Sequence, residues 1–213
     1  MLKFKQFFLR IVELTNSFAE TIEEALMTYL DKYSIPLSRL VGFGSDGASV
    51  MIGKHSGVAA RIKAKQPILT SIHCMAHRLA LVAGQAGDQV MIIADTFKPT
   101  LKHLFYFYDN SPVRLSGLKA LEELLQTPEL KLKKPLDTRW LSHDAACQTL
   151  KKILPAVTVS LEREAEERWE ALAVGLCKVV QRYNFIATLY MMMCDALSKV
   201  SRLSRIFQLY TCY

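Results

Sequence analysis

Residues 40–57 have the sequence LVGFGSDGASVMIGKHSG, and the fold prediction for the N-terminal half starts from them. An apolar run leads into Asp46, Gly47 interrupts it, and basic residues follow. We predict a buried strand within residues 37–47, because apolar residues run together and a glycine ends the run. Asp46 would stand at the carboxyl end of that strand. It is there either a ligand or catalytic carboxylate, or a turn residue whose side chain bonds the backbone two residues on.

The segments around this stretch alternate between strand and helix patterns. Branched and aromatic residues predict further strands at residues 4–14 and 68–74. Helical spacing predicts helices at residues 16–33, 57–66 and 75–85. Ser17, with Glu20 three residues later, matches a capping box for the first of these helices. Because strands alternate with helices, the predicted fold class is α/β, with a short parallel sheet and covering helices.

The second half of the chain has a different pattern. From about residue 89 the strand signals fade, and helical periodicity appears at residues 118–125, 141–154 and 161–183. The last of these segments predicts a solvated glutamate-rich face opposite an apolar stripe that includes Trp169. Residues 127–135, TPELKLKKP, are predicted to form a loop. We therefore expect an α/β region at residues 1–90 and a mainly α-helical region at residues 91–213.

Composition narrows the function classes. At 213 residues and 51% hydrophobic content, the chain can bury a core. Its net charge of +7 leans towards an anionic partner, and its five scattered cysteines favour a reducing, intracellular compartment. The longest uncharged apolar run, residues 185–194, is far shorter than the roughly 20 residues of a membrane span. No membrane partner and no small-molecule substrate are expected.

A second motif, SIHCMAHRLAL at residues 71–81, gathers zinc-ligand residue types. His73, Cys74 and His77 lie within five residues, but a structural zinc site needs about four ligands and no second pair follows. These side chains can equally well pack under a strand-to-helix turn. The glycines around Asp46 match neither a P-loop nor a dinucleotide fingerprint, and no Ser-His-Asp or Cys-His arrangement is supported.

A third motif is LDTRWLS at residues 136–142. Arg139 could pair with a phosphate through its guanidinium, and Trp140 could stack on a base. The alternative is a buried Trp140 that anchors the next helix, with Arg139 at the surface. The spacing alone favours this alternative.

Taken in order, residues 42–63, 71–81 and 136–143 resemble the central part of hAT-family transposases. They are most similar to the vertebrate zinc-finger-862-like group of transposon-derived proteins, and residues 196–208 resemble part of that family's helical insertion. The resemblance implies a ribonuclease-H-like core that carries a DDE site of three carboxylates. Residues 4–14 would be its third strand.

The same resemblance assigns roles to individual residues. Asp46 matches the second carboxylate of the DDE site, and Cys74 with His77 matches a C-x-x-H motif close to it. Arg139 and Trp140 match an R-W pair associated with flipped or hairpinned DNA. We expect Asp46, Cys74 and His77 to meet at one edge of the sheet.

Only one of the three expected carboxylates is matched, whereas two-metal phosphoryl transfer needs several. We therefore expect a catalytically inactive, transposase-derived fragment that is nuclear by kinship. Asp46 alone would hold Mg²⁺ weakly, so no cofactor is expected, although an intact homologous site would use Mg²⁺. A replacement carboxylate would come from Asp88, Asp95, Asp137 or Asp144.

Retained DNA binding would be electrostatic and independent of sequence. The basic residues expected to supply it follow Asp46 in the chain: Lys54, Arg61, Lys63 and Lys65. Two other hypotheses stay open. The chain could be part of an active transposase completed by flanking segments, or a protein-interaction scaffold that uses its helical half.

Overall fold

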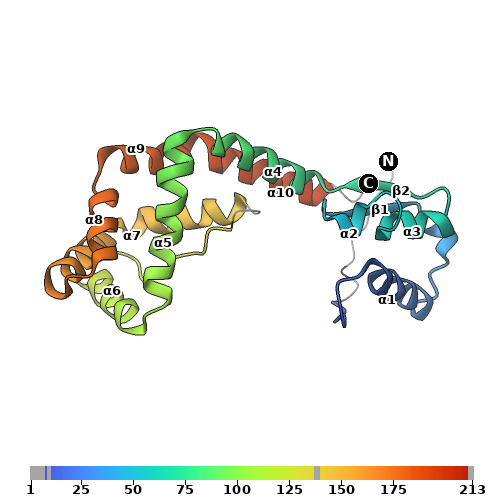
Figure 1. Cartoon of the computed structure of the whole chain (residues 1–213), viewed down its shortest axis with the longest axis horizontal. Helices are drawn as coiled ribbons and strands as arrows, with labels where there is room; N and C mark the ends of the chain where they lie inside the picture. The colour runs from blue at the N-terminus through green and yellow to red at the C-terminus, as the bar shows by residue number, and fades with distance from the viewer. Residues whose placement is uncertain (1–7, 9–10, 137–139, 211–213) are drawn as a thin grey trace. The chain divides into compact units, whose positions relative to one another are not determined.

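A computed structural model describes residue 8, residues 11–136 and residues 140–210 (Figure 1). The chain divides into two compact units, residues 1–78 with 205–213 and residues 79–204. We call them the sheet unit and the helical unit. The division falls inside helix α4 (Met75–Asp88), whereas the boundary between residues 90 and 91 stays a prediction.

The sheet unit contains two short parallel strands. Strand β1 (Gly42–Ser45) pairs with strand β2 (Thr70–His73), so that Gly42 lies opposite Thr70 and Ser45 opposite His73. Three α-helices and a 3₁₀ turn accompany them: α1 (Ala19–Lys32), η1 (Leu37–Arg39), α2 (Ser49–Ile52) and α3 (Val58–Lys65). The parallel pairing and the covering helices confirm the α/β prediction at this level.

The core of the sheet unit is small. The buried apolar cluster at its centre consists of Val58, Ile62 and Leu69, and Phe43 packs beside them from β1. Gly42 and Gly44, on either side of Phe43, lie on the opposite face of the strand and are exposed. The prediction that this strand is buried is therefore wrong. Alternate residues of a strand face opposite sides, and only the side that carries Phe43 is covered.

Two expectations for the first residues fail in the structure. Within the predicted strand at residues 4–14, the described residues, Phe8 and 11–14, are not in a strand, and their side chains are exposed. The capping box is also wrong, because α1 begins at Ala19 and makes no bond to a capping side chain of its own N-cap. Asn16 Oδ1 instead accepts hydrogen bonds from the Phe18 N–H and the Thr21 hydroxyl. An Asn side chain competes well for such local bonds.

The helical unit contains every described element from residue 79 to residue 204. Its elements are the greater part of α4, then η2 (Ile92–Phe97), α5 (Lys98–Asp109), α6 (Pro112–Leu124), α7 (Trp140–Arg168), α8 (Ala171–Val180), α9 (Tyr183–Met191), η3 (Met192–Leu197) and the first residues of α10 (Ser198–Tyr210). Two of these elements, η2 and η3, are π-helices. Residues 127–135 form the predicted loop, and the mainly helical character of residues 91–210 is confirmed where the structure describes them.

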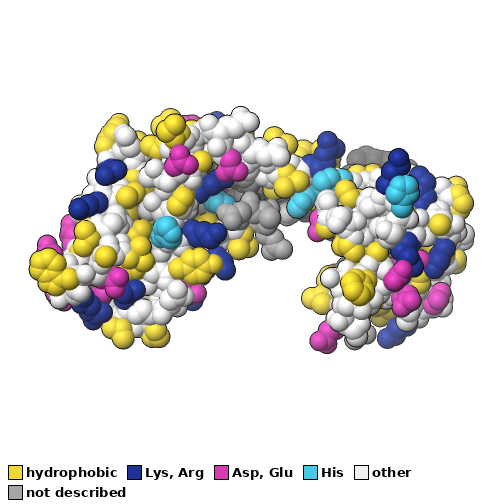
Figure 2. All heavy atoms as spheres, in the orientation of Figure 1, with side chains coloured by type: hydrophobic (Ala, Val, Ile, Leu, Met, Phe, Trp, Pro, Cys, Tyr) yellow, Lys and Arg dark blue, Asp and Glu magenta, His cyan; other side chains and the backbone are white. Residues whose placement is uncertain are grey.

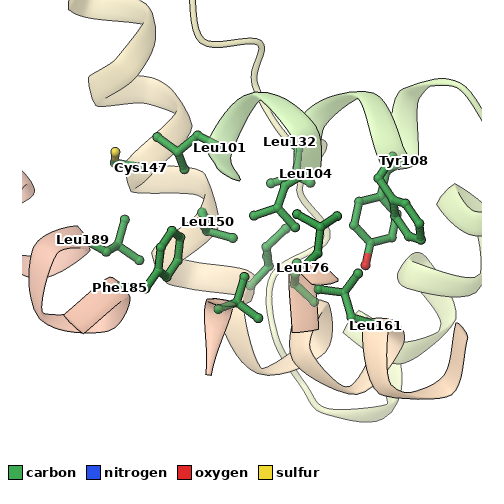
Figure 3. Packing of buried hydrophobic residues seen from close by; sticks show 14 of the residues in the cluster. Leu101, Leu104, Tyr108, Leu132, Cys147, Leu150, Leu161, Leu176, Phe185 and Leu189 are labelled. Atoms are coloured by element: carbon green, nitrogen blue, oxygen red, sulfur yellow. The ribbon is translucent and has the colours of Figure 1, made fainter. Parts of the chain in front are cut away.

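Apolar side chains from helices α5 to α9, from η2 and η3 and from the loop before α7 form the core of this unit. Leu101 and Leu104 of α5 meet Leu150 of α7, Leu176 of α8 and Phe185 of α9, as Figure 3 shows. Each of these side chains is almost completely removed from water. Burial on this scale is the main favourable term in helix packing.

Helix α7 differs from the prediction in two places, at Pro155 and at Trp169. It continues through Pro155, although an interior proline removes one backbone hydrogen bond and costs about 3 kcal/mol. Apolar side chains are buried on both sides of Pro155, including Leu150, Ile153 and Leu161, and their packing keeps the helix continuous. The segment predicted as one helix, residues 161–183, instead breaks at Trp169, which has a φ of 52° and an exposed side chain.

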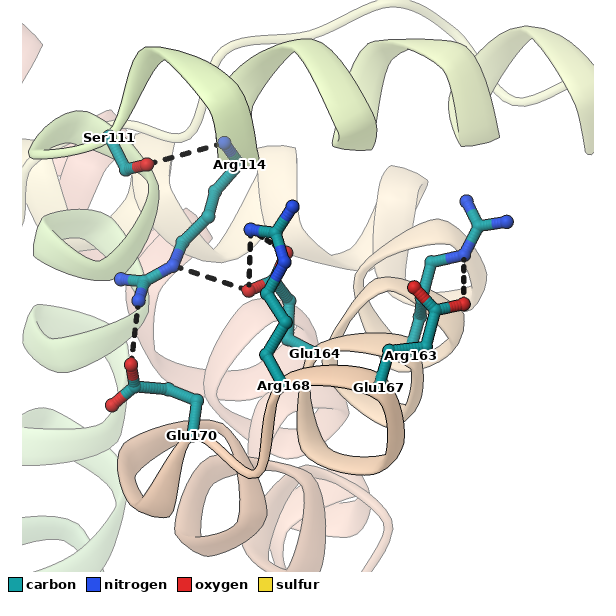
Figure 4. A network of polar contacts seen from close by, with 7 residues as sticks. All are labelled: Ser111, Arg114, Arg163, Glu164, Glu167, Arg168 and Glu170. Atoms are coloured by element: carbon teal, nitrogen blue, oxygen red, sulfur yellow. Dashed lines mark hydrogen bonds and ion pairs between the residues drawn. The ribbon is translucent and has the colours of Figure 1, made fainter.

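The glutamate-rich face of α7 is also more buried than predicted. Glu164 is buried and forms ion pairs with Arg114 of α6 (3.5 Å) and with Arg168 (3.0 Å), as Figure 4 shows. Arg114 also pairs with Glu170 at 2.9 Å, and its guanidinium lies 4.1 Å from the centroid of the Phe107 ring. The polar network therefore links α6, α7 and the residue that precedes α8, and the prediction of a wholly solvated face is wrong at Glu164.

No helix in the part of the chain that the structure describes is both long and apolar enough to cross a membrane.

Candidate functional site

The sheet brings the first two sequence motifs to one edge. Ser45 and His73 are the last residues of β1 and β2, and they lie opposite each other in register. Just beyond them, the Cys74 N–H donates a hydrogen bond to the Ser45 carbonyl (2.7 Å). Since the strands are parallel, Asp46 and Cys74 follow the same end of the sheet, where α/β folds open a crevice for ligands.

Asp46 takes part in a tight turn. Its side chain is exposed, and its Oδ1 accepts a hydrogen bond from the Ala48 N–H at 3.1 Å. This is the Asx-turn geometry in which aspartate replaces a backbone acceptor. Of the two alternatives left by the sequence, the turn role is therefore present in the structure.

Two histidines stand beside this turn. A methyl group on Gly47 would lie 2.6 Å from His73 Cε1 and 2.7 Å from His73 Nε2, so the ring packs directly on the turn. The His77 ring, from the first turn of α4, lies 5.4 Å from the His73 ring between centroids. Cys74 between them is a half-buried free thiol. The structure therefore brings the Asp46 turn, Cys74 and His77 to the same sheet edge.

His73 enters the sequence analysis only as a zinc-ligand type, without a role at the Asp46 turn. Its Nε2 is buried and has no hydrogen-bond partner among the described residues. Its contact with Gly47 fixes the turn that carries Asp46. The signal in the sequence was the glycine directly after Asp46, because a larger residue there would collide with the ring.

The donor atoms at this edge do not fit Mg²⁺. Asp46 offers carboxylate oxygen, but its neighbours offer imidazole nitrogen and thiol sulfur, whereas Mg²⁺ is held by about six oxygen ligands in octahedral geometry. Within residues 8, 11–136 and 140–210, no three His, Cys, Asp or Glu side chains gather closely enough to hold a metal ion. The zinc interpretation of the His73, Cys74 and His77 motif therefore gains no support from these residues.

The four predicted basic residues fall into two pairs. Arg61 and Lys65 lie one helical turn apart on α3 and face α1. Arg61 bonds Glu23 (2.6 Å) and Glu20 (3.1 Å), and Lys65 bonds Glu23 (2.7 Å). Lys63 projects from the other side of α3, and Lys54 lies in the loop before it. Both are exposed, and neither forms an ion pair among the described residues.

The ion pairs change the acidity of the groups that form them. Glu23 is buried, which by itself would raise its pKa, but the hydrogen bond from Lys65 and the nearby Arg61 lower the pKa of this carboxyl. The hydrogen bond to Glu23 in turn raises the pKa of Arg61. Arg61 and Lys65 thus stabilise the contact between α1 and α3, and Lys54 and Lys63 are the cations best placed for an outside partner.

The remaining predicted residues lie elsewhere. Arg139, like Asp137, falls outside the described residues, and Trp140 is known only as the first residue of α7. The three possible replacement carboxylates that the structure describes, Asp88, Asp95 and Asp144, belong to the helical unit. Asp88 pairs with Lys98, Asp95 is exposed in η2, and Asp144 is buried and bonds Gln148.

No family model matches this chain, and no solved structure matches it significantly. The candidate site therefore rests on its own geometry.

Proposed function

We propose that this chain is a transposase-derived, hAT-like nuclear module that binds DNA through charge, without reading its sequence, and that does not cleave it. The observation that carries the proposal is the meeting of the Asp46 turn with Cys74 and His77 at one end of two parallel strands. This is the arrangement that the resemblance to the hAT family implies for the second DDE carboxylate and the C-x-x-H motif. A partial ribonuclease-H-like core is part of the same proposal.

Charge supports the binding part of the proposal. The chain carries a net charge of +7, and Lys54 and Lys63 expose their ammonium groups on the unit that holds Asp46. Lysine acts on phosphate as a point charge, so it attracts the DNA backbone without distinguishing bases. Binding of this kind releases counterions and weakens steeply as salt rises.

The chemistry of Asp46 supports the second part. One oxygen of its carboxylate is bonded to its own turn, and the nearest side chains supply nitrogen and sulfur rather than the hard oxygens that Mg²⁺ requires. In a complete DDE site, further carboxylates would have to come from other segments. The rival hypothesis, an active transposase, requires flanking segments that supply those carboxylates.

The binding test uses the full chain and a labelled DNA duplex, followed by fluorescence anisotropy at several salt concentrations. The affinity of wild type for DNA should fall by up to about 10³-fold between 50 and 200 mM salt. Duplexes of unrelated sequence should bind equally well. Lys54→Gln with Lys63→Gln should weaken binding and flatten the salt dependence. Lys152→Gln with Lys178→Gln removes the same charge from exposed positions of the helical unit and serves as the control. Salt-independent binding would contradict the proposal.

The cleavage test incubates the same protein with labelled duplex and Mg²⁺ or Mn²⁺, beside Asp46→Asn. We expect no cleavage above background from either protein. Cleavage by wild type that Asp46→Asn abolishes would establish the rival, an active nuclease. If the chain neither binds nor cuts DNA, the scaffold hypothesis takes the place of this proposal.

A further inference from the structure

The loop between α2 and α3 is closed by two glycines. The Gly57 N–H donates a hydrogen bond to the Gly53 carbonyl at 3.0 Å, and the Gly53 N–H donates to the Ser49 carbonyl at 2.8 Å. The two glycine backbones also touch, since a methyl group on Gly57 would lie 2.7 Å from the Gly53 oxygen. Residues 53–57, GKHSG, therefore form a short loop whose two ends are held together. We call it the glycine-closed loop.

Three polar side chains occupy the tip of this loop. Lys54, His55 and Ser56 are all exposed, and none of them has a hydrogen bond, an ion pair or a ring contact with the residues that the structure describes. They differ in this from the cations of α3 that face α1, Arg61 and Lys65, which are already paired. Figure 2 shows a histidine side chain next to lysine or arginine side chains on the surface of this unit. The polar groups of the tip are therefore available to an outside partner.

The chemistry of these three side chains fits a phosphate group. An ammonium supplies positive charge, and a hydroxyl and an imidazole N–H each donate a hydrogen bond to a phosphate oxygen. Residues 47–66 contain no Asp or Glu, so the loop and the two helices beside it carry no opposing charge. The same residues contain no Phe, Tyr or Trp that could stack on a base. The loop therefore suits the backbone of DNA rather than its bases.

We propose that the glycine-closed loop binds one phosphate of the DNA backbone through Lys54, His55 and Ser56 together. The inference rests on the proposed function and deepens it, because it adds His55 and Ser56 as contacts. It also gives the two glycines a role, which is to hold the loop in shape. A loop whose ends are fixed loses less conformational freedom on binding than an open loop loses. Gly53 and Gly57 are thus positioning residues, and the three side chains touch the phosphate.

The first experiment measures DNA binding by variants of the full chain, using fluorescence anisotropy with a labelled duplex. Ser56→Ala should weaken binding by about two- to fivefold and leave the slope of log K against log salt unchanged, because a lost hydroxyl changes no counterion release. Lys54→Gln should weaken binding and make that slope shallower by about 1. Ser38→Ala, at an exposed position of η1, is the control and should bind like wild type.

The same assay tests the histidine. His55→Ala should weaken DNA binding by about two- to fivefold, since it removes a second hydrogen-bond donor from the loop. His103→Ala removes an exposed histidine from α5 in the helical unit and should leave the affinity unchanged. Equal effects of the two variants would show that His55 makes no specific contact and would overturn its role. Thermal unfolding followed by circular dichroism verifies that each variant is folded.

The second experiment tests the glycines. Gly57→Ala keeps all three contact side chains but forces the two backbones apart, so it should weaken DNA binding and make the salt slope shallower by about 1, as Lys54→Gln does. A smaller folded fraction alone would lower the affinity without changing that slope. Ile62→Val, which removes a methyl group from the core of the same unit, is the control for stability and should keep the slope of wild type. An unchanged slope in Gly57→Ala would overturn the positioning role.

The outcomes separate this inference from the proposed function. If wild type does not bind DNA, both fall. If Lys54→Gln with Lys63→Gln weakens binding while His55→Ala and Ser56→Ala do not, the proposed function stands and the inference is overturned. If the loop variants weaken binding and Lys63→Gln alone does not, the inference stands and the contact assigned to Lys63 falls. If Ser56→Ala weakens the binding of inorganic phosphate, measured by calorimetry, but not that of DNA, the loop is a small-anion site and the inference is wrong.

Discussion

The sheet unit and the helical unit are stabilised in different ways. Among the described residues, the main core of the sheet unit holds three buried apolar side chains, whereas that of the helical unit holds 23. In the sheet unit, the buried Glu23 carboxylate forms ion pairs, and the backbone at Gly57 approaches the backbone at Gly53 closely. We infer that apolar truncations will cost most in the helical unit, and that charge and close backbone contacts will decide the stability of the sheet unit.

The largest effect is expected in the helical core. Phe185 is 2% exposed and packs against the Phe97 ring, with 5.4 Å between centroids. Phe185→Ala should lower the free energy of unfolding by about 3–5 kcal/mol, because it removes a large apolar group and leaves a cavity. Urea unfolding, with amide exchange in α5 and α9, measures the loss. Tyr183→Ala is the control, since Tyr183 is 82% exposed and should stay within about 0.5 kcal/mol. Equal losses would refute the assigned core.

The next effect tests backbone contact in the sheet unit. A methyl group on Gly57 would lie 2.4 Å from the Gly53 nitrogen and 2.7 Å from its carbonyl oxygen, and neither atom can move without shifting the backbone. Gly57→Ala should therefore cost about 1–3 kcal/mol through overpacking. Gly44→Ala is the matched control, because no atom lies within 4 Å of the added methyl group. If both variants are equally stable by urea unfolding, the close approach of the two glycines is wrong.

The same two units show what the sequence could predict. The parallel pairing of residues 42–45 with 70–73 and the helical second half followed from strand-helix alternation and periodicity. These patterns depend on local spacing, which a sequence displays directly. The break at Trp169 could not be predicted in this way. An aromatic residue in the apolar stripe suggests burial, and nothing local indicates its left-handed backbone conformation.

The contacts that individual side chains make with residues far away in the chain were harder to predict from the sequence. Asp46, Cys74 and His77 were expected to meet because parallel strands end on one side. The structure places Gly47 of the Asp46 turn against His73, and the His77 ring lies 5.4 Å from the His73 ring, at the sheet edge that Cys74 also follows. The pairing of Arg61 with Glu23 joins residues 38 positions apart in the chain. A basic run in a sequence therefore indicates charge, but only the fold decides which cations already have partners. The DDE assignment itself stays a prediction.

A smaller effect, with a pH dependence, concerns Glu23. Glu23→Gln should cost about 1–2 kcal/mol at pH 7, since Arg61 and Lys65 are partly exposed and water screens their loss. The folded state lowers the pKa of Glu23, so its stabilising effect is present above the ordinary value of about 4.3 and is lost as pH falls below it. The urea midpoints of wild type and Glu23→Gln should therefore differ at pH 7 and converge at pH 3. Glu24→Gln, an exposed neighbour, should show no such convergence.

The smallest effect is expected at Trp169, and its sign is reversed. This side chain is 85% exposed, so it contributes little burial, while its φ of 52° is a conformation that costs a residue with a Cβ atom about 1–2 kcal/mol. Trp169→Gly relieves that cost but gives the unfolded chain more freedom, which leaves a net stabilisation of about 0.5 kcal/mol. Glu166→Gly, three residues earlier within α7, should instead destabilise by about 1 kcal/mol, because glycine is a poor helix former. Urea unfolding of the two variants side by side gives the comparison. A loss at position 169 as large as that at 166 would mean that the Trp169 ring packs on the helical unit, and the contrast between its buried core and its exposed turn would not hold there.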